Sequence, residues 1–168
     1  MLTSLVGRTS SRRGVTLIEM MMVVMVMSLM AGVTFPAISS GVDSLRLRSA
    51  GEEAASILTA AMNRAERRRV AVEIAVSPID NVMLLTSVEP GYSKRFRPVD
   101  GVTIAAILPR VPADPRPPRR FLVYPGGSAP RLGLILANAR GMRRLVRLDP
   151  ITGIAESRTL EPNEELLP

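Results

Sequence analysis

Apolar and polar positions along the chain follow three successive patterns, and the first is a long uncharged run. No charged residue occurs from Met20 to Val42, where nearly every position is apolar or small. Because about 20 such residues form a helix that crosses the hydrocarbon core of a membrane, we predict a transmembrane segment over residues 15–42. Pro36 need not end this helix, since prolines inside membrane helices usually kink them instead.

The second pattern, over residues 43–69, is amphipathic. Apolar residues recur there every three or four positions, and Arg and Glu occupy much of the remainder, which is helix spacing. We predict that the helix continues through this stretch as a stalk beyond the lipid. The apolar positions are Leu47, Ala50, Ala54, Ile57 or Leu58, Ala61 and Ala65.

The third pattern, over residues 70–160, consists of short apolar runs separated by Gly, Pro, Asn and Asp, which predicts a β-rich domain. Residues 149–153 (DPITG) are typical of a hairpin turn. Residues 109–118 hold five prolines in ten positions and predict an extended loop. Residues 161–168 form an acidic tail. The predicted strands are 70–76, 83–87, 102–108, 121–124, 132–136, 144–148 and 154–158.

Composition lowers the expectation of catalysis. The 168 residues include no Cys and no His, which removes thiolate chemistry and the commonest acid–base residue and zinc ligand. Four scattered carboxylates show no paired or metal-ligand spacing and are interpreted as solvated: Glu73, Asp80, Glu89 and Asp100. We therefore expect no enzyme, no metal site and no cofactor.

The first 14 residues are basic, with Arg8, Arg12 and Arg13 and no acid. A basic stretch before an apolar run is typical of a secretory signal peptide or signal anchor, with the basic end kept in the cytoplasm. Glu19 does not fit that interpretation, because a carboxylate inside a membrane costs about 2.5–3.5 kcal/mol even on a lenient scale.

Cleavage between Gly14 and Val15 would explain Glu19. The new amine of Val15 would be a cation one helical turn from the carboxylate, which also lies at the favourable end of the helix dipole. In an assembly, the amine of one subunit could meet Glu19 of its neighbour and fix the register between chains.

The residues GVTLIE at 14–19, followed by an apolar helix, resemble the class III signal of type IV pilins and type II secretion pseudopilins. The resemblance implies cleavage after Gly14 by a prepilin peptidase, methylation of the new N-terminus, Glu19 as the fifth mature residue, and Pro36 as the family's helix proline. Val15 departs from the usual Phe or Met at the first mature position, which puts the efficiency of methylation in question.

Two further stretches, 121–130 (FLVYPGGSAP) and 132–156, resemble the C-terminal part of the GspH/FimT group of minor pseudopilins and minor pilins. This resemblance implies an α+β fold: a long N-terminal helix packed on a small antiparallel β-sandwich. It also implies a single span in the bacterial inner membrane before assembly, a periplasmic domain, and contacts with other pilins or pseudopilins and with an inner-membrane assembly platform.

The C-terminal half is basic, with nine Arg and one acid between Arg110 and Arg147. Alternation along a strand would put Arg143 and Arg147 on one face with Leu145, and Arg144 on the other. Arg119 and Arg120 could join from an adjoining loop. FimT-like minor pilins that take up DNA carry a Gly/Arg-rich stretch in a similar region.

Three interpretations of this basic region remain open: DNA binding, contact with subunits or a membrane surface, and solvated charge. The chain is accordingly a GspH-like structural subunit of a secretion pseudopilus, a DNA-binding minor pilin, or a signal-anchored domain unrelated to filaments.

Overall fold

The computed structural model describes residues 14–111 and 116–161, except for the side chains of Pro36 and Ala37. The predicted leader 1–14 and the acidic tail 161–168 therefore lie almost entirely outside the described residues. The chain divides into two units, Met1–Ser40 and Gly41–Pro168, which are described separately.

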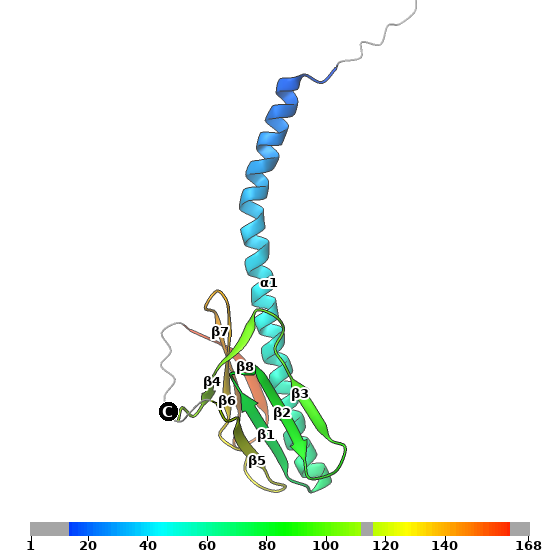
Figure 1. Cartoon of the computed structure of the whole chain (residues 1–168), viewed down its shortest axis with the longest axis vertical. Helices are drawn as coiled ribbons and strands as arrows, with labels where there is room; N and C mark the ends of the chain where they lie inside the picture. The colour runs from blue at the N-terminus through cyan, green and yellow to red at the C-terminus, as the bar shows by residue number, and fades with distance from the viewer. Residues whose placement is uncertain (1–13, 112–115, 162–168) are drawn as a thin grey trace, which may run out of the picture. The chain divides into compact units, whose positions relative to one another are not determined.

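A single helix, α1 (Leu17–Arg68), accounts for the first unit and begins the second, which confirms the predicted long helix (Figure 1). The helix continues through Pro36, as expected. In the first unit no described residue from Leu17 to Ile38 is buried. This half of α1 is long and apolar enough to cross a membrane.

In the second unit α1 buries the face that the amphipathic pattern predicted. Residues such as Ala54, Leu58 and Ala61 are fully buried there, whereas Glu52 and Glu53 are exposed. Small residues dominate this face, so the helix backbone can approach the strands closely. Gly51 is the extreme case, since an added Cβ would lie 2.5 Å from Ser157 Oγ.

Two four-stranded antiparallel sheets follow the helix, in the orders β3-β2-β1-β5 and β4-β6-β7-β8. We call them sheet A and sheet B. The strands of sheet A are β1 (Val72–Ser77), β2 (Val82–Ser87), β3 (Ser93–Phe96) and β5 (Arg119–Val123); those of sheet B are β4 (Val102–Leu108), β6 (Gly133–Asn138), β7 (Arg143–Leu148) and β8 (Ala155–Leu160).

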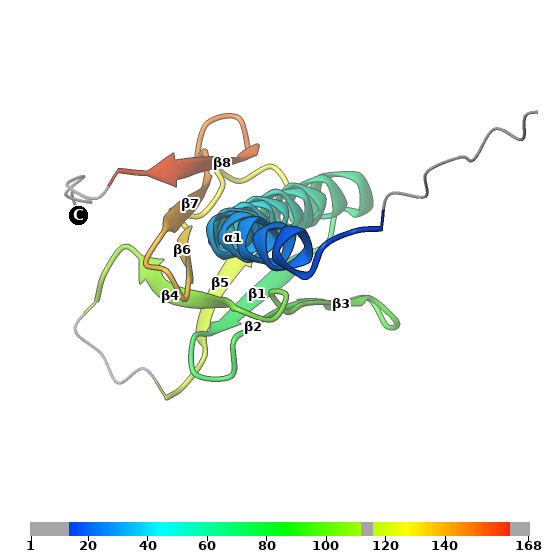
Figure 2. The ribbon, with the colours of Figure 1, turned by 90° about the horizontal axis from the view of Figure 1, so that it is seen from above.

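The inner faces of both sheets and the second half of α1 enclose one hydrophobic core. Viewed from above in Figure 2, this part of the helix lies between β8 on one side and β3 on the other. Alternating residues such as Ile74 of β1 and Leu134 of β6 are completely buried because each strand turns one face to the helix. The predicted α+β fold, a long helix packed on antiparallel strands, is confirmed.

The strand prediction fails in two places. β3 was missed, because Ser-Lys-Arg-Phe has one apolar residue and no apolar alternation to mark it. Arg119 and Arg120 were placed in a loop but begin β5, where pairing with β1 extends the strand backwards from Phe121. Both errors have one cause, since edge strands need only one neighbour and tolerate charged side chains.

The turns of sheet B are held by side chains. Asp149 accepts hydrogen bonds from Ile151 N and Thr152 Oγ1, at 2.8 and 2.9 Å, which confirms the predicted 149–153 turn. At the opposite end of β7, Asn138 Oδ1 accepts from the main-chain N–H of Arg140 and Met142.

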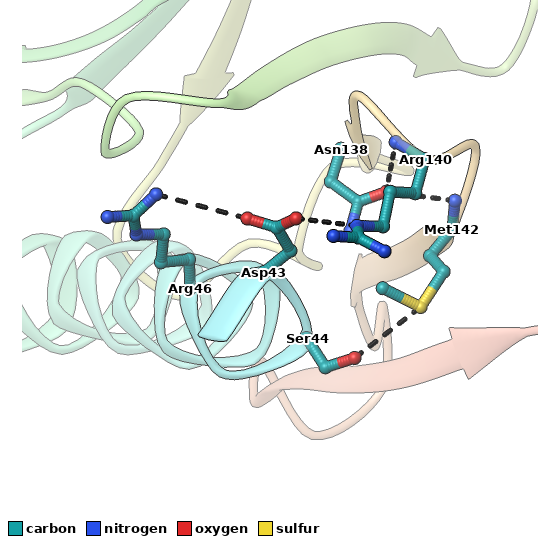
Figure 3. Close-up of polar contacts among 6 residues, drawn as sticks. All are labelled: Asp43, Ser44, Arg46, Asn138, Arg140 and Met142. Carbon is teal, nitrogen blue, oxygen red and sulfur yellow. Dashed lines mark hydrogen bonds and ion pairs between the residues drawn. The ribbon is translucent and has the colours of Figure 1, made fainter. Parts of the chain in front are cut away.

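An ion pair joins this second turn to the helix (Figure 3). Arg140 Nε lies 2.7 Å from Asp43 Oδ2, and Arg46 lies 3.9 Å from the other oxygen of the same carboxylate. Ser44 Oγ approaches Met142 Sδ at 3.5 Å. The start of the second unit is thus tied to sheet B by polar contacts, beyond the end of the apolar core.

Candidate functional site

The proposed cleavage position lies in an accessible, non-helical segment. Gly14 and Val15 are exposed and precede the first helical residue, Leu17. A Cβ added at Gly14 would find nothing within 4 Å. A peptidase can therefore reach the Gly14–Val15 bond without unwinding the helix.

Thr16 and Glu19 fix where the helix begins. Glu19 N donates to Thr16 Oγ1 at 3.3 Å, so Thr16 caps the helix and Glu19 is its third residue. Thr-x-x-Glu is the sequence of a capping box, a signal that our sequence analysis did not use. The Glu19 carboxylate lies in the first turn, where the helix dipole favours a negative charge.

The surface of the first unit is its most distinctive chemical feature. Apolar side chains are exposed all around α1, for example Leu17 at 80%, Phe35 at 77% and Val33 at 77%. A helix that is apolar on every side is stable only in lipid or against other apolar surfaces. This half of α1 is accordingly suited to a membrane or to a bundle with other apolar helices.

The two arginines of β5 do not form a free basic surface. Arg119 Nη1 donates to the carbonyl oxygens of Ile107 and Pro109, at 3.4 and 2.7 Å, and the guanidinium lies over the ring of Phe121. Arg120 pairs with Glu73 at 2.7 Å. Arg119 therefore serves to link β5 to the end of β4, and the charge of Arg120 is compensated locally.

The arginines of β7 separate as alternation predicted. Arg144 lies on the helix-facing side, where its Nε donates to Ser157 Oγ at 2.6 Å. Arg143 and Arg147 are exposed on the outer face, with Leu145 buried between them. The five candidate arginines thus fall into three places in the fold.

Carboxylates accompany Arg147 on the outer face of sheet B. Glu156 is its cross-strand partner, and Asp149 lies close by at the hairpin turn, lining the same shallow pocket. The pKa of Asp149 is lowered, first by the hydrogen bond from Ile151 N, next by the Thr152 hydroxyl, and least by the charge of Arg147. Arg158 lines the same pocket, so the surface around Arg147 carries charges of both signs.

The carboxylates interpreted as solvated are mostly engaged. Glu73 pairs with Arg120, Asp80 accepts from Ser77 Oγ at 2.7 Å, and Glu89 lies 2.6 Å from Arg64. Each of the three therefore has a partner that the sequence interpretation did not include, although Asp80 is also exposed as expected. Across residues 14–111 and 116–161, no group of three or more His, Cys, Asp or Glu side chains is arranged to hold a metal ion.

The sequence analysis missed a second basic group, because it did not predict the strand β3 on which the group lies. Lys94, Arg95 and Arg97 lie on or just after β3 and are all exposed. For these three side chains, the described part of the chain offers no ion pair. The signal was present as SKRFR at 93–97, but it was not recognised as a strand.

Comparison with known proteins agrees with the N-terminal site. Residues 9–35 match the family described as Prokaryotic N-terminal methylation motif. No curated protein and no solved structure matches the chain. The matched segment includes Gly14, Val15 and Glu19 and extends over most of the exposed apolar helix. Together with the α+β layout, the motif supports a type IV pilin-like subunit with the prepilin processing signal, and the apolar helix among the described residues is suited to an inner-membrane anchor.

Proposed function

We propose that the chain is a minor pseudopilin of the GspH type, a structural subunit of the pseudopilus of a type II secretion system. The observation that supports this most directly is the methylation motif at residues 9–35 on a helix whose apolar surface is exposed on all sides. Such a subunit performs no reaction. It is processed by a prepilin peptidase, anchored by one span and then packed helix-to-helix with other pilins or pseudopilins.

In this proposal the basic end of the leader stays in the cytoplasm and the sheets lie in the periplasm, because Arg8, Arg12 and Arg13 precede the apolar run. Glu19 pairs with the methylated amine of Val15 during assembly, when lipid is replaced by neighbouring helices. An unpaired carboxylate there would be costly, so the pair favours one axial register over the alternatives.

The alternative is a FimT-like minor type IV pilin that binds DNA. Arg143 and Arg147 favour it, because both are exposed on the outer face of sheet B. The secretion role is preferred because Arg119, Arg120 and Arg144 are engaged elsewhere, and because Glu156 and Asp149 accompany Arg147.

The test is the intact mass of the chain coexpressed with a prepilin peptidase. We expect loss of residues 1–14, with one added methyl group, and no cleavage of Gly14→Ala. Glu19→Ala should be cleaved but should fail to enter filaments assembled with partner pseudopilins. A wild-type chain that stays uncut, or is cut elsewhere, would refute the pilin-like assignment of the processing site.

A second measurement separates the two filament systems. The processed subunit should copurify with minor pseudopilins of the secretion type. Binding of a DNA duplex that falls at least tenfold in Arg143→Gln/Arg147→Gln, but is unchanged in Arg67→Gln/Arg68→Gln, would favour the minor-pilin alternative instead.

A further inference from the structure

The edge strands of the two sheets are protected to different degrees. A strand at the edge of a sheet leaves alternate main-chain N–H and C=O groups without a ladder partner, which is a template for another strand. In sheet B, Asn81 occupies the edge of β4: its Nδ2 donates to Val102 O at 2.9 Å, and its Oδ1 accepts from Ile104 N at 2.8 Å.

The other edge of sheet B is also occupied. Ala155 N of β8 donates to Thr59 Oγ1 of α1 at 3.1 Å, and Ser157 O accepts from Arg144 at 3.2 Å. Gly51 allows the helix to lie directly against this strand. Side chains and the helix therefore satisfy part of both edges of sheet B.

β3, at the edge of sheet A, differs. Ser87 N donates to Tyr92 O, so the pairs Leu85–Lys94 and Met83–Phe96 are the hydrogen-bonded ones. The main-chain groups of Ser93 and Arg95 consequently point away from β2. Asn81 and Thr59 make hydrogen bonds to the outward main-chain groups of sheet B. Among the described residues, no side chain does the same for Ser93 and Arg95.

The cations of this edge match an acidic strand. Arg95 and Arg97 are two positions apart, so their side chains share one face of the strand and are about 7 Å apart along it. An incoming strand with carboxylates on one face would place them opposite these guanidinium groups. Oppositely charged cross-strand pairs contribute favourably to pairing.

The chain itself carries an acidic segment, in which Glu161 and Glu165 would share one face of an extended strand and Glu164 would lie on the other. Residues 161–168 read EPNEELLP, with three Glu and no basic residue, and positions 163–167 contain no proline. Five consecutive residues that can all donate an N–H are enough for a short edge strand.

We propose that the β3 edge of one subunit binds the acidic segment 161–168 of a second copy as an added strand. The donor segment and the acceptor edge are different surfaces, so the contact is heterologous. A contact of this kind propagates from one subunit to the next as an open helical array when the rotation between subunits does not close a ring, which is the property that a filament requires. The inference extends the proposed function to a contact between periplasmic domains, but its test uses the uncleaved chain and is independent of processing.

The experiment separates donor from acceptor. One chain ends at Glu161 and keeps β3; the other keeps the acidic segment and carries Lys94→Gln/Arg95→Gln/Arg97→Gln. Each is purified in detergent micelles, one chain per micelle, and sedimentation measures association. We expect neither to self-associate and the mixture to form a 1:1 complex. Association of either chain alone, or none in the mixture, would overturn the proposal.

A peptide titration tests the chemistry. The synthetic peptide EPNEELLP should bind the chain that ends at Glu161, whereas KPNKKLLP should not. Binding should fall at least tenfold when the three β3 cations become Gln. It should change less than twofold in Arg67→Gln/Arg143→Gln/Arg147→Gln, which removes the same charge elsewhere. Equal losses in the two variants would refute a specific edge and indicate general charge attraction.

Ser93→Pro tests strand addition without changing any charge. It removes an outward N–H and leaves the bonded pairs of β2 and β3 in place, so we expect peptide binding to fall at least fivefold. Unchanged binding would mean that the cations attract the peptide without a β-ladder. A dT12 oligonucleotide that binds the edge as well as the peptide does, with no effect of Ser93→Pro, would identify a polyanion surface instead.

The simplest alternative is that charges on β3 only prevent aggregation, which is a common device of edge strands. In that case EPNEELLP would not bind at all, and the Gln variant would aggregate while the wild-type chain stays monodisperse. Either result contradicts a docking edge.

Discussion

The two halves of α1 belong to one helix but bury their apolar side chains in different ways. In the first unit Leu29 is 63% exposed, whereas Leu58 in the second unit is completely buried against the strands. The second half has an apolar face and a charged face; the first half is apolar all around. The second half therefore buries its apolar side chains against strands of its own chain. The first half can bury them only in lipid or against neighbouring subunits.

This comparison teaches where mutations should act. Changes in the second half should alter the free energy of unfolding of the sheets, whereas matched changes in the first half should alter insertion or assembly and leave that free energy unchanged. Three pairs of identical residues, one in each half, allow a direct comparison. The measurement in each case is urea unfolding of the whole chain in detergent micelles, followed by circular dichroism.

Leu58→Ala and Leu29→Ala should differ most. Leu58 is fully buried in the core, so truncation leaves a cavity and should cost about 2–5 kcal/mol. Leu29→Ala should change the unfolding free energy of the sheets by less than about 0.5 kcal/mol, as expected away from packed sites. A similar loss in both variants would mean that the two halves unfold as one cooperative unit.

Gly51→Val and Gly32→Val form the second pair. A Cβ at residue 51 would lie 2.5 Å from Ser157 Oγ and 2.8 Å from Arg144 Cδ, whereas a Cβ at residue 32 has nothing within 4 Å. Overpacking at Gly51 should cost about 1–3 kcal/mol. Gly32→Val should leave the unfolding of the sheets unchanged. If Gly51→Val were neutral, close approach of the helix to β8 would not be needed.

Thr59→Ala and Thr34→Ala test a single hydrogen bond. Thr59 Oγ1 accepts from Ala155 N on β8, while Thr34 Oγ1 donates to Met30 O within its own helix. Losing the Thr59 acceptor should cost about 1 kcal/mol, a typical net value for one such bond. Thr34→Ala should not change the sheets, and Thr59→Ser, which keeps the hydroxyl, serves as a positive control.

The smallest effect is a pH dependence confined to the second unit. The lowered pKa of Asp149 means that its contribution to stability is present above the pKa of the unfolded chain and is lost as the pH falls through the lower pKa of the folded state. Asp149→Asn should therefore be less stable than the wild type at pH 7, and the difference in unfolding free energy should shrink as the pH falls below about 4, near the ordinary pKa of Asp. An unaltered acid profile would exclude Asp149 as a contributor.

Much of the fold could be predicted from the sequence, because it depends on local patterns of residues. The uncharged run, the apolar spacing from Leu47 to Ala65 and the DPITG turn all depend on neighbours within a few residues, and the structure confirms each of them. The processing motif is also local, and the match over residues 9–35 supports it.

The positions of the arginines on the surface could not be predicted in this way, because they depend on which strands become neighbours. Arg119 and Arg120 are adjacent in sequence, but β5 directs one to the carbonyl oxygens at the end of β4 and the other to Glu73. The cations at positions 94, 95 and 97 were overlooked because a four-residue edge strand has too little apolar content to be detected.

The sequence by itself therefore determined the helix, its apolar and amphipathic halves, the β-rich domain and the processing motif, because helix period, turn chemistry and a contiguous motif are encoded within short stretches. Tertiary structure alone decided which arginines are engaged and which sheet edges other residues cover. Charge compensation and edge protection arise from residues such as Glu73, Asn81 and Thr59, which lie far along the chain from the groups that they contact.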